Sequence, residues 1–191
     1  MDISLNEVEM QATKAARGAG LAWGQAEDIG RAARWLAERG IDWARPLLGL
    51  LADAEARAAF AQASRVADDA ATPEGAVVCT PLWMIPLLAM ACRVRGAALT
   101  ARWPTLCAGI GSDGRVSLNR RPAEIEMSPS PVRITPGQHE VLAYPLATGV
   151  RRGHLGAKQW KELDAFVTRT YVPSSFRSRA AGAGSGLTDN D

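Results

Sequence analysis

The stretch Leu82–Cys92, LWMIPLLAMAC, is the most apolar part of the chain, and it separates a half with helical periodicity from a half with strand periodicity. Its 11 residues are too few for a membrane span, which needs about 20. Such a run is typical of a helix buried in a core. Proline lacks an amide hydrogen and clashes with the preceding turn, so Pro86 predicts a kink or a break. We therefore expect a core helix at 82–95 that ends at Gly96 and packs against a sheet.

The residues before this stretch follow a helical pattern. Ser4 and Glu7 have the spacing of a capping box, which predicts a helix start. Apolar and small residues then recur at helical spacing in two successive segments. The second segment starts near Gly24 and carries Glu27 and Asp28 in its first turn, where acidic side chains favour the helix dipole. Because both apolar stripes are rich in small residues, we expect the two helices to pack closely as an αα-hairpin.

The residues after Gly96 alternate between apolar and polar side chains, which is typical of an antiparallel sheet with one solvated face. Ser112-Asp-Gly114 is a turn signal between two such runs. We expect strands at 97–103, 105–110, 115–119, 124–127, 132–135 and 139–145. A last helix is expected from about Ala157 to Arg169, and its buried side is formed by Trp160, Leu163, Phe166 and Val167.

The predicted fold class is therefore α+β, with a helical N-terminal half, an antiparallel β-sheet in the C-terminal half, one C-terminal helix and a flexible tail. We expect a single domain over residues 1–179, in which 1–95 is helical and 97–172 holds the sheet and the last helix. Residues 180–191 are expected to form the flexible tail. Its glycines at 182–186 oppose a helix, because each glycine costs about 1 kcal/mol relative to alanine.

Composition excludes several classes of protein. The 191 residues carry a net charge of +2, which is too balanced to indicate binding to nucleic acid or to a membrane surface. Three cysteines without a CxxC pair and two histidines argue against a disulfide scaffold and a metal centre. No cofactor is predicted. The N-terminus MDISLNEVEM lacks the apolar region of a signal peptide, so we expect a cytoplasmic protein that does not enter membranes.

The segment RGAGLAWG at 17–24 is the most distinctive motif. Its glycines permit positive φ and close backbone approach, and the helix that follows could receive an anion. Arg17, Gly18, Gly20 and Trp23 are therefore candidate residues of a binding loop. A helix precedes the motif, whereas the dinucleotide-binding fingerprint requires a strand, so that reading is rejected. The alternative is a tight connection between two helices, with Trp23 as a packing anchor.

Four side chains are candidates for acid–base chemistry. Glu27 and Asp28 are adjacent on a helix, where complementing the dipole is the alternative role. His139 begins a strand after a turn, and His154 lies in a glycine-rich loop. At such places a histidine is commonly a surface or capping residue, and that alternative stays open.

The region 150–180 has seven Lys and Arg against two Asp and Glu, a net charge of +5, whereas residues 1–70 have a net charge of −3 from eight Lys and Arg against eleven Asp and Glu. Arg151, Arg152, Lys158 and Arg169 are therefore candidates to bind a carboxylate or phosphate. A solvated basic face is the alternative. The opposite charges of the two regions also fit a symmetric homodimer.

The opening SLNEVEMQATKAARGAGLAWGQAEDIGRAARWLAERGID and the closing TYVPSSFRSRAAGAGSGLTDND resemble the two ends of a family of bacterial proteins of unknown function and similar length. The resemblance implies a bacterial, soluble, single-domain protein. It implies no activity, ligand or catalytic residue.

Two functions follow as hypotheses. The first is a soluble, non-catalytic accessory or binding protein for a protein partner or a small anionic ligand. The alternative is a small cofactor-independent enzyme that acts on a carboxylate-bearing metabolite. In that case Arg151, Arg152 or Arg169 would hold the carboxylate, and Glu27, His139 or His154 would transfer the proton. A deep pocket in which a histidine or Glu27 faces two arginines would favour the enzyme.

Overall fold

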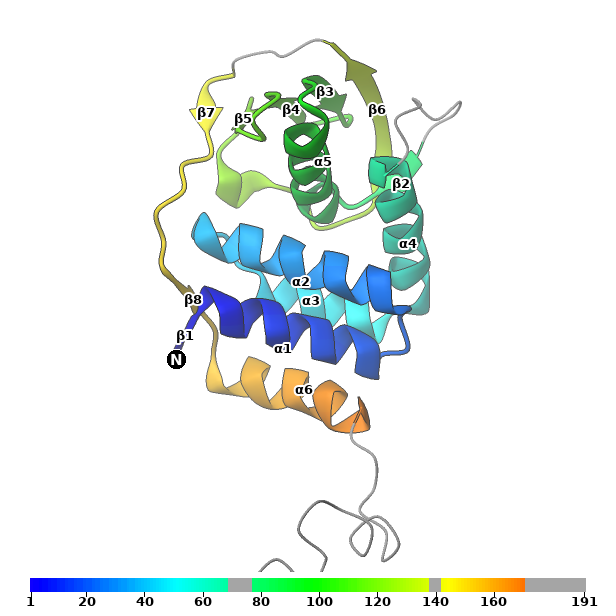
Figure 1. Cartoon of the computed structure of the whole chain (residues 1–191), viewed down its shortest axis with the longest axis vertical. Coiled ribbons are helices and arrows are strands. Elements are labelled where there is room, and N and C mark those ends of the chain that lie inside the picture. Colours follow the sequence, from blue (N-terminus) through cyan, green and yellow to red (C-terminus); the bar gives the residue numbers. More distant parts are fainter. Residues whose placement is uncertain (69–76, 138–141, 171–191) are drawn as a thin grey trace, which may run out of the picture.

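The computed structural model describes residues 1–68, 77–137 and 142–170. Helices form the N-terminal half, an antiparallel sheet follows and a helix ends the described chain, so the predicted α+β class is confirmed (Figure 1). His139 and the tail expected at 180–191 lie outside the described residues. No described helix combines the length and the apolarity that crossing a membrane requires.

The helical half contains α1 (Leu5–Gly18), α2 (Trp23–Glu38), α3 (Ala44–Ala52) and α4 (Ala54–Asp68). The predicted capping box starts α1. The Ser4 hydroxyl accepts a hydrogen bond from the Glu7 amide, and the Glu7 carboxylate accepts one from the Ser4 amide at 2.7 Å. Because α2 begins at Trp23, Glu27 and Asp28 lie in its second turn and not in its first.

Helices α1 and α2 form the close αα-hairpin that the small residues predict. Their contact buries Ala12, Ala15, Ala26 and Ala33 completely. A β-carbon on Gly30 of α2 would lie 2.1 Å from the Thr13 hydroxyl oxygen of α1. Only glycine therefore permits this approach of the two helices.

Helix α5 (Pro81–Arg95) is the expected core helix. It is buried from Pro81 to Ala89 and again at Cys92. Gly96, with φ of 66°, ends it in the left-handed conformation that glycine adopts easily. The helix continues through Pro86, so of the predicted kink or break the break does not occur. Burial of the flanking side chains offsets the one backbone hydrogen bond that Pro86 cannot donate.

The larger sheet is antiparallel throughout and has the strand order β2-β6-β3-β4-β5-β7. Its strands are β2 (Val77–Cys79), β3 (Leu99–Arg102), β4 (Cys107–Ile110), β5 (Val116–Leu118), β6 (Ser130–Pro136) and β7 (Tyr144–Pro145). The strand expected at 124–127 does not form. A 3₁₀ turn, η1 (Pro122–Glu124), precedes irregular chain there, and Ile125 packs on the core as a single anchor.

One solvated face was expected for this sheet, and the central strands depart from that. Thr100, Gly109 and Ser117 face one another across β3, β4 and β5, and all three are buried. The Ser117 hydroxyl accepts a hydrogen bond from the amide of Leu142 at 3.0 Å. The Leu142 backbone thus contacts Ser117, a small polar residue that the alternation alone assigns to solvent.

A second, two-stranded sheet pairs β1 (Asp2–Ser4) with β8 (Arg152–His154). The loop predicted at His154 is therefore wrong, because a strand of three residues is too short to show a period. Helix α6 (Ala157–Val167) follows, then the 3₁₀ turn η2 (Thr168–Thr170). Leu163 and Val167 are buried as predicted, while Trp160 and Phe166 are partly buried.

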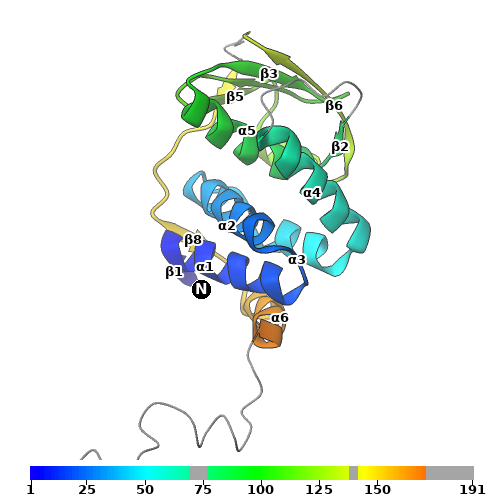
Figure 2. The ribbon, with the colours of Figure 1, turned by 45° about the vertical axis from the view of Figure 1, so that its right-hand side comes forward.

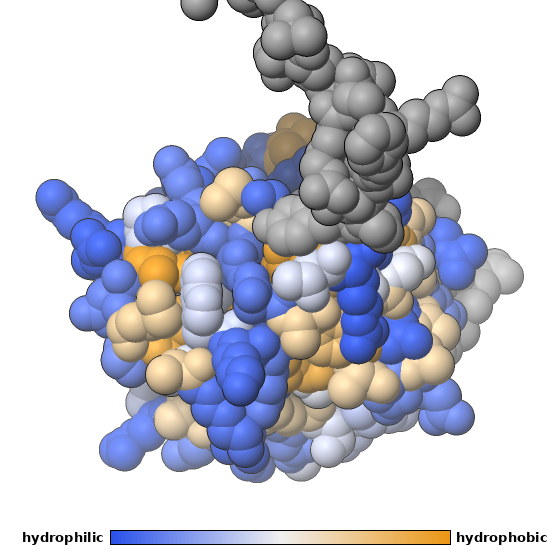
Figure 3. Space-filling view, turned by 90° about the horizontal axis from the view of Figure 1, so that it is seen from below, coloured by the Kyte–Doolittle hydropathy of each residue, from blue (hydrophilic) through white to orange (hydrophobic). Residues whose placement is uncertain are grey.

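The elements stack in layers along the molecule (Figures 1 and 2). The larger sheet lies at one end with α5 beneath it, followed by α2 and α3, then α1 and finally α6. The segment between β7 and β8 descends along one side and joins the two ends. Buried residues from all of these layers form one hydrophobic cluster. The face seen from below shows hydrophobic residues between hydrophilic ones (Figure 3).

Candidate functional site

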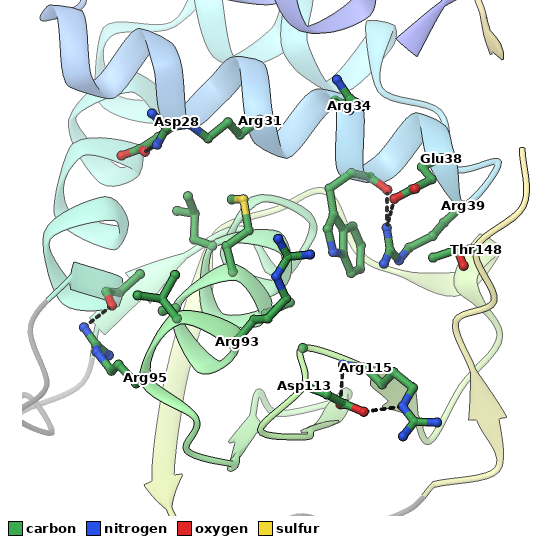
Figure 4. Close-up of a pocket in the computed structure, with 18 of the residues that line it drawn as sticks. Asp28, Arg31, Arg34, Glu38, Arg39, Arg93, Arg95, Asp113, Arg115 and Thr148 are labelled. Carbon is green, nitrogen blue, oxygen red and sulfur yellow. Dashed lines mark hydrogen bonds and ion pairs between the residues drawn. The ribbon is translucent and has the colours of Figure 1, made fainter. Parts of the chain in front are cut away.

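A groove of about 850 Å³ opens between α2 and α5. Helix α2 gives one wall and the last two turns of α5 give the other (Figure 4). The end of α4, the turn between β4 and β5, and Thr148 from the descending segment complete the lining. The groove is therefore built from segments far apart in the sequence, which the layered fold brings together.

Arginine dominates the charged lining of this groove. Six arginines stand against four acidic residues: Arg31, Arg34, Arg39, Arg93, Arg95 and Arg115 against Asp28, Glu38, Asp68 and Asp113. A guanidinium group matches the geometry of carboxylate and phosphate better than an ammonium group does. This excess of guanidinium groups suits an anionic ligand.

Most of these arginines already have partners. Arg31 pairs with Asp28 at 3.2 Å, Arg39 with Glu38 at 3.0 Å, Arg115 with Asp113 and Arg34 with Glu9 of α1 at 3.1 Å. Arg95 donates to the backbone carbonyls of Ala67 and Asp68 at the end of α4. Three of these contacts lie within one element or turn, while Arg34 links α2 to α1 and Arg95 links α5 to the end of α4.

Arg93 differs from the others. It lies in the last turn of α5, is exposed, and makes no ion pair or hydrogen bond with the described part of the chain. Its guanidinium group points from α5 into the groove toward α2 (Figure 4). It is therefore the lining cation best placed to meet a ligand.

Arg39, at the end of α2, is the most deeply placed of the lining cations. Its side chain is only 9% exposed, and its guanidinium carbon lies 3.7 Å from the centre of the Trp35 ring. One terminal nitrogen donates to the Trp35 carbonyl and to Glu38, while Nε has no acceptor among the described residues. Burial lowers the pKa of Arg39. A buried donor without an acceptor is costly, so an anion that supplied one would gain affinity.

Asp28 is the half-buried acid of the groove. Its carboxylate accepts a hydrogen bond from the Ser64 hydroxyl of α4 and pairs with Arg31. Burial raises the pKa of Asp28, and the hydrogen bond from Ser64 opposes that rise. A carboxyl group with a raised pKa in a groove is suited to accept or donate a proton.

The basic residues predicted from the sequence lie elsewhere. Arg151, Arg152, Lys158 and Arg169 are exposed, and none lines the groove. The Arg152 side chain donates to the Asp2 carbonyl, and Lys158 lies 3.8 Å from Glu162. Arg151 and Arg152 precede α6 and Arg169 follows it. The 11 residues of that helix span about 16 Å, so the basic region is not one compact site.

Neither His154 nor Glu27 lines the groove. His154 is exposed on β8, and its Nδ1 lies 2.8 Å from the Asp2 carboxylate. Glu27 is exposed on α2 and pairs with Arg31 at 3.1 Å. It lies beside the groove, whose lining includes its neighbour Asp28.

The candidate loop residues gather at the turn between α1 and α2. Gly20 has φ of 91°, as a glycine in a tight turn permits. Trp23 is 65% exposed, so its predicted role as a packing anchor is wrong. The Arg17 guanidinium lies 5.0 Å from its ring centre. At the start of α2, the Gln25 side chain already accepts a hydrogen bond from the Ala22 amide.

Sequence reasoning missed Arg39 and Arg93. Arg93 and Arg95 are the cations that end an otherwise apolar helix, and such residues are usually read as complements of the helix dipole. Arg39 precedes the glycine that follows α2, where a cation is likewise interpreted as a complement of the helix dipole. Only the fold shows that the two helix ends border one groove.

No group of three or more His, Cys, Asp or Glu side chains in the described ranges could hold a metal ion. Cys79, Cys92 and Cys107 are buried thiols. Burial raises the pKa of Cys79 to about 12 and that of Cys92 to about 11.

Residues 3–74 match a family described as "Protein of unknown function (DUF3726)". The predicted resemblance to an uncharacterised family is thus confirmed over β1 and α1 to α4. The matched part includes the α2 wall of the groove and ends before α5. No curated protein matches the chain, and no solved structure matches it.

Proposed function

We propose that this chain binds a small anionic ligand in the groove between α2 and α5. A carboxylate or phosphate group of the ligand binds to the guanidinium of Arg93 and reaches toward Arg39. The observation that carries the proposal is Arg93, a cation without a described partner, which points into a groove that already contains more arginines than acids.

The size and lining of the groove support a metabolite and not a macromolecule. Its volume of about 850 Å³ falls in the usual range for small-molecule sites, about 300–1,000 Å³. Apolar side chains such as Leu87 and Met90 line it beside the arginines. A ligand with one anionic group and a compact apolar part fits this combination.

A thermal-shift screen of carboxylates, inorganic phosphate and phosphate esters tests the proposal. At least one anion should raise the melting temperature of the native chain, and Arg93→Ala should remove that rise. Arg120→Ala is the matched control, because Arg120 is exposed and lies outside the groove. If no anion stabilises the chain, or if both variants respond like the native chain, the proposal is wrong.

A small cofactor-independent enzyme that acts on a carboxylate-bearing metabolite is the second candidate. Asp28 favours it, because a half-buried carboxyl with a raised pKa borders the same groove. Each anion that binds can be incubated with the chain in D₂O and followed by NMR. Deuterium uptake or conversion that Asp28→Asn removes, while binding persists, would support catalysis. Binding without any chemical change would support a binding protein.

The proposal also includes a bacterial source and a cytoplasmic compartment. The three buried thiols support the compartment, because cytoplasmic cysteines are kept reduced.

A further inference from the structure

Helix α1 lies on the outside of the molecule, between α2 and α6 (Figures 1 and 2). Its outer stripe consists of Glu7, Met10, Lys14 and Arg17, which are three or four positions apart and therefore share one face. All four side chains are exposed, and Met10 is 50% exposed. The stripe is an exposed helix face with an acid at one end, an apolar side chain in the middle and cations at the other end.

This order makes the stripe complementary to its own reversed copy. If a two-fold axis crosses α1 at the level of Ala12, Glu7 lies opposite the partner's Arg17. The same axis places Met10 opposite the aliphatic stem of the partner's Lys14. Because the axis is two-fold, each contact occurs twice.

We infer that α1 is the contact surface of a symmetric homodimer, in which the α1 helices of two copies pack antiparallel. Both cations are available for this contact. Lys14 makes no ion pair with the described residues, and Arg17 contacts only the Trp23 ring and the Leu21 carbonyl there. Trp23, 65% exposed, extends the surface past Arg17, and tryptophan is enriched in protein interfaces.

A second copy fits better than other partners, because one stripe carries both signs of charge in reversible order. An acidic protein or a nucleic acid would meet the cations and be repelled by Glu7. The 14 residues of α1 span about 21 Å. A single helix face of this length with one tryptophan buries less than the roughly 1,200–2,000 Å² of a standard stable interface. The dimer is therefore weak, with dissociation in the micromolar range, and salt-sensitive.

Sedimentation velocity of the full chain over a micromolar concentration series tests this surface. At low salt the native chain should dimerise, and salt near 1 M should dissociate it, since the Debye length then falls to about 3 Å. Arg17→Glu should weaken the dimer about tenfold or more, because it places two like-charged contacts with Glu7 across the axis. Lys14→Glu should also weaken it, because it replaces the long aliphatic stem that packs on Met10 of the other copy with a shorter acidic side chain. Arg120→Glu, outside the stripe, is the control and should leave the dimer unchanged.

The charge swap is the most selective variant. Glu7→Arg combined with Arg17→Glu restores opposite charges across the axis and should recover dimerisation that Arg17→Glu loses. Circular dichroism checks that each variant is folded, since Glu7 also belongs to the capping box. Lys14→Glu keeps the test decisive if variants at Glu7 do not fold. A native chain that stays monomeric at low salt, or a dimer that Lys14→Glu and Arg17→Glu leave intact, would overturn the inference.

Discussion

The α-carbon of Gly18 faces the Phe166 carbonyl so closely that a β-carbon there would lie 1.8 Å from the carbonyl oxygen. The contact fixes the C-terminal end of α1 against the C-terminal end of α6, which come from opposite ends of the described chain. It explains the first glycine of the RGAGLAWG motif by packing, with no ligand required.

Replacement of Gly18 by alanine should therefore destabilise the fold by about 1–3 kcal/mol, the usual cost of overpacking. The sign is diagnostic, because alanine alone would favour the helix by about 1 kcal/mol. The matched control is Gly24→Ala, where a β-carbon would meet no atom within 4 Å. Urea denaturation measures both, and a Gly18→Ala variant as stable as the control would contradict the contact.

Helix α5 allows a matched comparison between core and surface. Leu88 is 2% exposed and Val94 is 87% exposed on the same helix. Leu88→Ala should lower the free energy of unfolding by about 2–5 kcal/mol, whereas Val94→Ala should stay within about 0.5 kcal/mol. A loss below about 1 kcal/mol at Leu88 would show that α5 is peripheral.

The thiols should be inert in the folded chain. Burial raises the pKa of Cys79 to about 12 and that of Cys92 to about 11, so neither forms much thiolate at pH 8. An aromatic disulfide reagent should find almost no reactive thiol in native protein and all three in denaturant. Fast labelling of Cys79 or Cys92 in the native state would refute their burial.

Asp28 gives a pH dependence with a definite sign. Its pKa is raised above the ordinary value of 3.8, first of all by burial. The folded state therefore binds the proton more tightly than the unfolded state, so this carboxyl contributes stability at pH below 3.8 and loses that contribution as pH rises through the raised pKa. Asp28→Asn removes this titration and keeps an oxygen that can accept from Ser64.

Chemical denaturation of both proteins between pH 3 and pH 7 measures this effect. The stability of the native chain relative to Asp28→Asn should fall as pH rises from 3.8 upward. A relative stability that rises with pH over the same window would mean that Arg31 outweighs burial at Asp28.

Periodicity predicted α1 and α2, because each buries residues that recur at helical spacing, and the unbroken apolar run predicted α5. Periodicity did not find β1 and β8, which have three residues each and gain their order from pairing with each other. The α1 capping box could be predicted because its two partners, Ser4 and Glu7, are three positions apart in the sequence. The groove could not be predicted, since Arg39 and Arg93 are 54 positions apart in the sequence. Only the packing of α2 on α5 brings them to the same groove.

The basic region at 150–180 shows that residues close in sequence need not form one site. Its charges are close in sequence, yet α6 separates Arg152 from Arg169 in space. The basic residues that are clustered in the sequence are therefore spread over the surface of the folded chain. The groove arginines, which are scattered through the sequence, converge instead.

Isothermal titration of the best anion from the screen into native chain, Arg93→Ala, Arg93→Lys and Arg120→Ala tests the central claim most directly. Arg93→Ala removes a charged hydrogen bond, which contributes about 1.5–3 kcal/mol, so this variant should bind the anion about tenfold to a hundredfold more weakly. Arg93→Lys should recover part of the affinity, and Arg120→Ala should bind like the native chain. Equal affinity for all four proteins would contradict an anion site at Arg93.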